Sequence, residues 1–287
     1  MLMGGLIMER LSGKVALVTG AARGQGRAHA IRLASEGADI IAFDSCSAFK
    51  STNYDPSTLA DLEETAKLVE AQGRRVIWRQ LDARDFPAVK DLVEEGTREL
   101  GRLDVVVLNH GICHYGYTWE VTEENWDEVI SVNLTSVWKV LKAVVPFMRE
   151  QGEGGSIIIT SSVAGVRGNP FLAPYVCSKH ALVGLTKTLA NELGQNRIRV
   201  NTVLPGGVMT PMAGFDWNGE KGESNPFAGE LNKPEIAATL GPIFMNALPD
   251  KWIEPDDVAN TVAFLASDES KFITGTEIPV DLGSTAR

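Results

Sequence analysis

The sequence has few of the residues that build disulfide frameworks and metal sites. Its three cysteines, Cys46, Cys113 and Cys177, lie far apart without a C-x-x-C pair, and its four histidines include no H-E-x-x-H motif. A disulfide-stabilised scaffold and a zinc protein are therefore not expected. We predict a protein without a bound metal that works in a reducing, cytoplasmic compartment.

Long apolar runs and an excess of basic residues are also missing from the sequence. No stretch approaches the ~18 consecutive apolar residues of a transmembrane helix. Residues 1–10 are predicted to be an apolar leader or extension, because they lack the layout of a signal peptide. The formal net charge is −10 and the pI is about 5.0. We therefore expect neither nucleic acid nor a membrane as a partner.

The main pattern in the sequence is an alternation of short apolar runs with amphipathic segments. Strands are predicted over 14–19, 39–43, 75–80, 103–108, 156–161, 198–204 and 278–280. Helices are predicted over 27–36, 56–72, 86–100 and 123–149, around Tyr175, and from Pro255 onward. This alternation predicts an α/β fold, a doubly wound parallel sheet of the Rossmann type. We expect a single domain over 11–287, in which the long Gly/Pro-rich segment 211–251 is a lid over the substrate.

A glycine-rich turn follows the first predicted strand and opens the first predicted helix. It reads Thr19-Gly20-Ala21-Ala22-Arg23-Gly24-Gln25-Gly26. Glycines permit a close approach of the backbone, and the N-terminus of a helix offers free N–H groups to a pyrophosphate. The turn therefore predicts a dinucleotide site.

Acidic residues at the ends of the next two strands bear on the choice of dinucleotide. Asp44 lies 18 residues beyond Gly26, where a carboxylate can accept hydrogen bonds from the ribose hydroxyls and repels a 2′-phosphate. Asp82 is placed to meet the adenine amino group. Asp44 favours NAD over NADP, whereas Arg23 favours NADP because its guanidinium could reach a 2′-phosphate. We predict NAD, since like-charge contact at the ribose is costly.

A tyrosine and a lysine on one predicted helix indicate acid–base chemistry. Tyr175 and Lys179 are four residues apart, so they lie one turn from each other on the same face. An ammonium group beside a phenol is expected to lower the pKa of the phenol and to fit it for proton transfer. Ser162 follows a strand and can donate to an oxygen on which charge develops. Asn133, midway along 123–149, is either a satisfied structural group or part of a proton path.

Taken in order, these motifs resemble the short-chain dehydrogenase/reductase superfamily over roughly Lys14 to Gly283. The resemblance implies the interconversion of a secondary alcohol and a ketone with a nicotinamide cofactor, and an active-site tetrad of Asn133, Ser162, Tyr175 and Lys179. The cofactor-binding residues that it implies are Gly20, Arg23, Gly24, Gln25, Gly26, Asp44, Asp82, Ala83, Asn109, Gly111, Tyr175, Lys179, Pro205, Gly206, Val208 and Thr210. Gln25 and His110 depart from the usual pattern, which has an aliphatic residue and an alanine at these positions. The family also implies a homotetramer.

A narrower resemblance is to the mycofactocin-coupled, carveol-dehydrogenase-like subgroup. The glycine turn, the long segment between Asp44 and Asp82, and the run Leu59…Gly73-Arg74-Arg75 carry it. It implies tightly held NAD, an apolar and often terpenoid alcohol, and a mycofactocin-linked redox partner. We expect the inserted loop, 45–58, to fold over the adenine end of the cofactor, and the aromatic residues Tyr115, Tyr117 and Trp119 to indicate an apolar pocket.

Two other functions remain open from the sequence. The first is an NADP-dependent ketone or 3-oxoacyl reductase, which Arg23 alone supports. The second is a nucleotide-sensing scaffold without catalysis, which would not require the tyrosine and the lysine.

Overall fold

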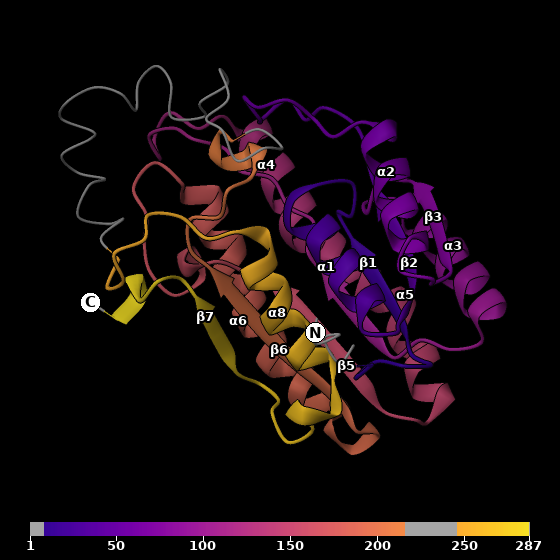
Figure 1. The fold of residues 1–287 in the computed structure, drawn as a ribbon. Coiled ribbons are helices and arrows are strands. Elements are labelled where there is room, and N and C mark those ends of the chain that lie inside the picture. The colour runs from indigo at the N-terminus through magenta and orange to yellow at the C-terminus, as the bar shows by residue number, and fades with distance from the viewer. Residues whose placement is uncertain (1–8, 216–245, 287) are drawn as a thin grey trace, which may run out of the picture.

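A seven-stranded sheet, parallel throughout, forms the centre of the structure, a computed structural model that describes residues 9–215 and 246–286 (Figure 1). The strands run in the order β3-β2-β1-β4-β5-β6-β7. Their bounds are β1 Val15–Thr19, β2 Asp39–Asp44, β3 Val76–Gln80, β4 Val105–Leu108, β5 Gly155–Thr160, β6 Ile198–Pro205 and β7 Glu277–Val280. This confirms the predicted doubly wound parallel sheet, and the predicted strand ends are right to within two residues.

Apolar residues bury the central strands on both faces. Every residue of β1, β2 and β4 is buried, as expected for strands that helices cover from two sides. The helices are α1 Gly24–Ser35, α2 Leu59–Glu70, α3 Phe86–Leu100, α4 Glu123–Ile130, α5 Ser136–Gln151, α6 Ala173–Leu193 and α8 Pro255–Ala266. The apolar residues of α1, α2 and α8 pack against one face of the sheet, and those of α3, α5 and α6 pack against the other.

The predicted helix 123–149 is not continuous. A π-helix, η1 Ser131–Thr135, separates α4 from α5, and the Ser136 amide bonds to the carbonyl of Ser131, five residues back. Such a widened turn is frequent at functional sites. By length and composition Glu123–Gln151 could cross a membrane, but half of its most apolar window is buried inside the protein, as in a core helix.

Two predicted segments leave the regular structure at the carboxyl ends of the strands. Residues 45–58 run between β2 and α2 without helix or strand, and α2 starts at Leu59, later than predicted, because the Thr58 side chain caps it in a capping box with Asp61. Of the predicted lid 211–251, the part 216–245 lies outside the described residues. The described part holds a short 3-10 helix, η4 Pro211–Ala213.

Candidate active site

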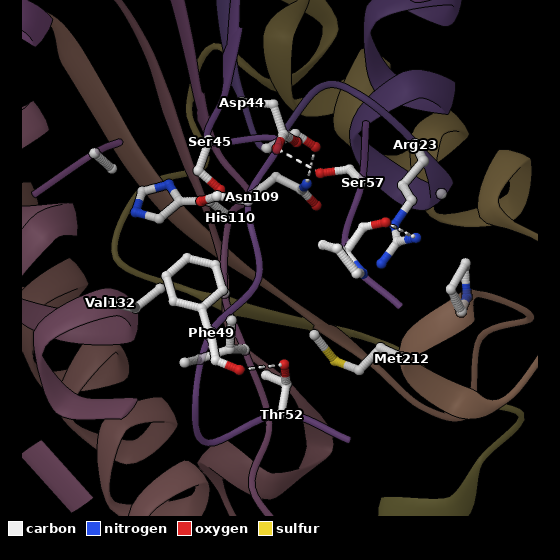
Figure 2. A pocket seen from close by; sticks show the side chains of 18 of the residues that line it. Arg23, Asp44, Ser45, Phe49, Thr52, Ser57, Asn109, His110, Val132 and Met212 are labelled. Carbon is white, nitrogen blue, oxygen red and sulfur yellow. Dashed lines mark hydrogen bonds between the residues drawn. The ribbon is translucent and has the colours of Figure 1, made fainter. Parts of the chain in front are cut away.

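Two adjoining cavities lie at the carboxyl ends of the strands. The first, about 180 Å³, is lined by the glycine turn, the ends of β2 and β3, and the inserted loop (Figure 2). The second, about 790 Å³, is lined by the ends of β5 and β6 and by the start of α6. Five residues line both cavities: Gln25, Asn109, Gly111, Thr210 and Met212. An elongated ligand can therefore extend from one cavity into the other across the switch point between β1 and β4.

The structure brings the predicted cofactor-binding residues to these two cavities, with one exception. Gly26 lines neither cavity, because it packs beneath the turn. A Cβ atom on Gly26 would lie 1.9 Å from the carbonyl oxygen of Gly20, so only glycine allows α1 to start this close to β1. Gly20 has a φ of +65°, and a Cβ there would lie 2.8 Å from the Cα of His110. Both glycines therefore shape the turn.

Asp44 lines the first cavity and holds three local groups. Its Oδ2 accepts from the Ala22 amide at 3.1 Å, and its Oδ1 accepts from the Cys46 amide at 3.0 Å and from the Ser57 hydroxyl at 2.8 Å. A carboxylate offers about four acceptor sites. One site is left for a ribose hydroxyl, and rotation of the Ser57 hydroxyl would free a second.

The guanidinium of Arg23 is directed to the inserted loop. It donates to the backbone carbonyl of Pro56 at 3.1 Å, and also to that of Asp55. Arg23 lines the cavity, but its guanidinium donates these hydrogen bonds to backbone oxygens of the loop. The expectation that it reaches a 2′-phosphate is therefore not supported by its position.

Asp82 forms an ion pair that the sequence did not predict. Its carboxylate binds the Arg84 guanidinium, with Nη2 and Oδ2 2.6 Å apart, and accepts from the Arg84 amide at 2.8 Å. These contacts lower the pKa of Asp82 despite its partial burial. Arg84 in turn lies 5.2 Å from the centre of the Phe49 ring, a cation–π contact. The pair therefore joins the end of β3 to the inserted loop.

Ser162, Tyr175 and Lys179 line the second cavity together. The Ser162 side chain bonds to Tyr175. The Lys179 ammonium lies 5.5 Å from the centre of the Tyr175 ring and donates to the main-chain oxygen of Thr160 at 2.8 Å. The helical spacing thus brings the phenol and the ammonium to one side of α6, as the sequence predicted.

The predicted lowering of the Tyr175 pKa is wrong for this structure. Burial is the largest cause that raises the Tyr175 pKa, and the charge of Cys113 is the next. The hydrogen bond from Ser162 acts in the opposite direction and lowers this pKa. Burial also lowers the pKa of Lys179 to about 8. Each charged form loses hydration in the cavity wall, and this loss is the largest cause of both shifts. The protonated phenol is the favoured state, and it is the state that can donate a proton to a ketone oxygen.

The side chain of Asn133 is a satisfied structural group. Its Oδ1 accepts from the Ile112 amide at 2.8 Å, while its Nδ2 donates to the Ile112 carbonyl at 2.9 Å and to the Ser178 hydroxyl at 3.1 Å. The residue is fully buried. Asn133 therefore fixes the loop after β4 against α6, beside the buried Lys179. The first of the two predicted interpretations is confirmed, and the proton path stays a prediction.

Two of the three aromatic residues expected in the pocket face elsewhere. Tyr115 lines the second cavity. Tyr117 instead stacks on Trp119 at a ring distance of 5.0 Å and meets Phe171 edge-on at 4.9 Å. This mutual packing turns both rings away from the cavity, and Trp119 is 79% exposed.

Several residues at the cavities were not found from the sequence. Tyr54 and Phe49 line the first cavity, and Cys113 lines the second. The Tyr54 hydroxyl accepts from the Cys113 amide at 3.3 Å, so the inserted loop reaches the substrate side of the site. No motif marks these residues, since they come from an irregular loop whose path depends on tertiary contacts. The length of the insertion was the only signal.

Comparison with known proteins finds similar sequences over nearly the whole chain. The family described as enoyl-(acyl carrier protein) reductase matches residues 20–285, and a (−)-trans-carveol dehydrogenase of Rhodococcus erythropolis is 41% identical over 286 residues, which are 98% of this chain and 100% of the relative. The chain belongs to the short-chain dehydrogenase/reductase family. The resemblance predicted from the ordered motifs is thereby confirmed.

Solved structures of short-chain dehydrogenases share the whole fold. A short-chain dehydrogenase from Mycobacterium paratuberculosis bound to NAD has a TM-score of 0.90 and 44% identity, covering 97% of this chain and 100% of its own. A carveol dehydrogenase from Mycobacterium avium in complex with NAD has a TM-score of 0.87 and 42% identity, covering 97% of this chain and 99% of its own. Similarity at this level extends beyond the sheet to the segments that surround the site.

Proposed function

We propose that this short-chain dehydrogenase/reductase is an NAD-dependent oxidoreductase that interconverts a small, apolar, terpenoid-like secondary alcohol and its ketone. The observation that carries the proposal is the position of Ser162, Tyr175 and Lys179 on one wall of a large cavity that adjoins the dinucleotide cavity. The relatives named for carveol dehydrogenase support the alcohol as the substrate class.

Each member of the tetrad has a proposed role that fits its contacts. The hydroxyl groups of Ser162 and Tyr175 bind the substrate oxygen. The protonated Tyr175 gives its proton to the ketone oxygen in reduction, and in oxidation Tyr175, after it has lost its own proton, takes the proton of the alcohol. Lys179 supplies positive charge near the phenol and holds the nicotinamide ribose. Asn133 fixes the loop that separates the two cavities and lies on the proposed proton path. NAD accepts or donates the hydride when bound.

The choice of NAD over NADP rests on Asp44 and Arg23. Asp44 is buried at the end of β2, where its negative charge would repel a 2′-phosphate. The Arg23 guanidinium, the only support for NADP, is bonded to backbone oxygens of the inserted loop. The NAD-bound structures of similar proteins agree with this choice. An NADP-dependent 3-oxoacyl reductase is correspondingly disfavoured.

We further propose that the inserted loop 45–58 holds NAD tightly. The loop is fastened on both sides of the first cavity: Ser57 bonds to Asp44 at one end, and the Ser51 amide donates to Glu128 on α4 at 2.7 Å. Two residues before Ser51, Phe49 points into the cavity beside Val132 (Figure 2). A nucleotide seated there would leave only after these bonds break.

The assembly and setting of the protein are proposed from its family. We propose a cytoplasmic homotetramer that passes electrons to a mycofactocin-linked redox partner. Trp126 and Trp138 support an interface on α4 and α5, since they are 37% and 50% exposed and tryptophan is enriched at protein–protein interfaces. The mass of the purified protein by light scattering tests the tetramer. We also propose that the chain forms a single domain, that residues 1–10 are an extension, and that residues 211–251 are a lid over the substrate.

One experiment tests the function directly. The purified protein is assayed with a panel of cyclic terpenoid alcohols and with simple secondary alcohols, using NAD or NADP as the added acceptor and, in parallel, an artificial electron acceptor in case bound NAD does not exchange. We expect turnover of secondary alcohols and no turnover through NADP alone. NAD binding without turnover of any alcohol or ketone would favour the nucleotide-sensing scaffold instead.

A further inference from the structure

His110 connects the cofactor turn to the helix that carries Asn133. Its ring nitrogen Nδ1 lies 2.6 Å from the hydroxyl of Thr19, the last residue of β1. Its other nitrogen, Nε2, lies 2.7 Å from the hydroxyl of Ser136, the first residue of α5. The imidazole thus spans the space between the glycine turn and the π-helix η1.

The direction of each hydrogen bond in this series, from Thr19 through His110 to Ser136, follows from the hydroxyl of Thr19. That oxygen accepts from the Asn109 amide at 2.9 Å and from the His110 amide at 3.2 Å. A hydroxyl has two lone pairs and one proton, so the Thr19 proton must go to Nδ1 of His110. The hydrogen of the neutral ring is then on Nε2 and is donated to Ser136.

Ser136 passes the connection on to the π-helix. Its hydroxyl donates to the carbonyl of Val132 at 2.5 Å. In an α-helix that carbonyl would accept from the backbone amide of Ser136, but this amide bonds to Ser131 instead. The Ser136 side chain therefore replaces the backbone bond that the wide turn gives up, and the residue next to Val132 in that turn is Asn133.

We propose that His110 is a positioning residue: its neutral ring orients Ser136 onto the Val132 carbonyl and so holds the π-turn, with Asn133, in register with the glycine turn. The inference rests on the proposed function only for the role of Asn133. The contacts from which it is argued are those of His110 with Thr19 and Ser136. The alanine that is usual at this position in the family cannot make either bond.

The surroundings of the ring keep it neutral. Burial, and after it the charge of Lys179, lowers the pKa of His110 to about 4, while Asp82 acts in the opposite direction. A second proton would occupy Nδ1 and break the bond from Thr19. The chain of bonds is therefore intact throughout the neutral pH range.

A double-mutant cycle tests whether His110 acts through Asn133. His110→Ala and Asn133→Ala are each expected to lower kcat about tenfold, and the double variant is expected to lose about as much as either single variant. Thr135→Ala removes an exposed hydroxyl from the same turn and is the matched control, with kcat unchanged. Losses that multiply to about a hundredfold in the double variant would overturn the inference, because they would make the two residues independent.

A measurement without turnover keeps the inference separate from the proposed function. Hydrogen–deuterium exchange of the peptide that covers 131–136 is expected to speed up about tenfold in both His110→Ala and Ser136→Ala, but not in Thr135→Ala. Unchanged exchange in both variants, with the fold intact, would refute the positioning role. If Asn133→Ala alone leaves kcat unchanged, the proposed proton path fails, and exchange still decides the role of His110.

Discussion

Lys179 donates its hydrogen bond to the main-chain oxygen of Thr160, and its ammonium lies 5.5 Å from the centre of the Tyr175 ring. The lysine is thus held by the end of β5 and lies beside the Tyr175 ring. Burial penalises the charged form of both groups, so the phenol is protonated and the pKa of the Lys179 ammonium falls to about 8. Because Tyr175 must exchange a proton with the substrate oxygen, we expect the rate of the reaction to depend on the protonation state of Tyr175.

Removing the Tyr175 hydroxyl should abolish most of the turnover. Tyr175→Phe is expected to lower kcat by about 10²-fold or more, because the ring still packs but cannot exchange a proton. Calorimetry should show NAD binding largely kept. Tyr117→Phe is the matched control, since that ring stacks on Trp119 outside the cavity. Near-normal activity of Tyr175→Phe would contradict the assignment.

Replacing Asp44 should weaken the preference for NAD. Asp44→Asn keeps the shape of the side chain but removes the charge that repels a 2′-phosphate, so the ratio of kcat/KM for NAD to that for NADP should fall about tenfold. Steady-state assays with both cofactors measure the ratio. Asp256→Asn, at an exposed position on α8, should leave it unchanged. An unchanged ratio in Asp44→Asn would place cofactor selection elsewhere.

Releasing the inserted loop should speed the loss of bound NAD. Arg23→Met removes the donors to Asp55 and Pro56, and a lost bond from a charged group corresponds to about tenfold or more in rate. Purification without added nucleotide, followed by mass spectrometry and stopped-flow release, measures the effect. Arg98→Met is the control, because the pair of Arg98 with Glu99 is exposed. If the unaltered protein retains no NAD, the loop does not hold the cofactor.

Two buried histidines should make the protein less stable as the pH falls below neutral. Burial lowers the pKa of His29 from 6.5 to about 3, and that of His110 from 6.5 to about 4. As the pH falls, the histidines of the unfolded chain therefore bind protons before those of the folded protein. Stability begins to be lost near pH 6.5, and the loss continues until the pH reaches the pKa values of the folded state. At pH 5 each histidine should cost about 2 kcal/mol relative to pH 7.5.

Urea unfolding at several pH values measures this dependence. His29→Gln should reduce the loss between pH 7.5 and 5 by about 2 kcal/mol, whereas His180→Gln should not, since His180 is exposed. An equal pH dependence in His29→Gln and in the unaltered protein would show that His29 is not buried in its neutral form.

The fold and the location of the site were accessible from the sequence because they depend on local patterns. The seven apolar runs, the glycine turn and the Tyr175–Lys179 spacing each occupy a short window, and the parallel connectivity then brings their carboxyl ends to one edge. The interruption of the helix at Asn133 was not predicted. It depends on Ile112, whose backbone bonds to the Asn133 side chain only when the loop after β4 packs on that turn.

The sequence by itself determined the class of sheet, the order of the motifs and the family, since strand burial, turn chemistry and helical spacing are local properties. Tertiary structure alone decided how these residues are used. It directs Arg23 to the inserted loop, raises the Tyr175 pKa instead of lowering it, and places His110 between Thr19 and Ser136. Hydrogen-bond partners and desolvation come from segments distant in the chain, and no spacing along the sequence encodes them.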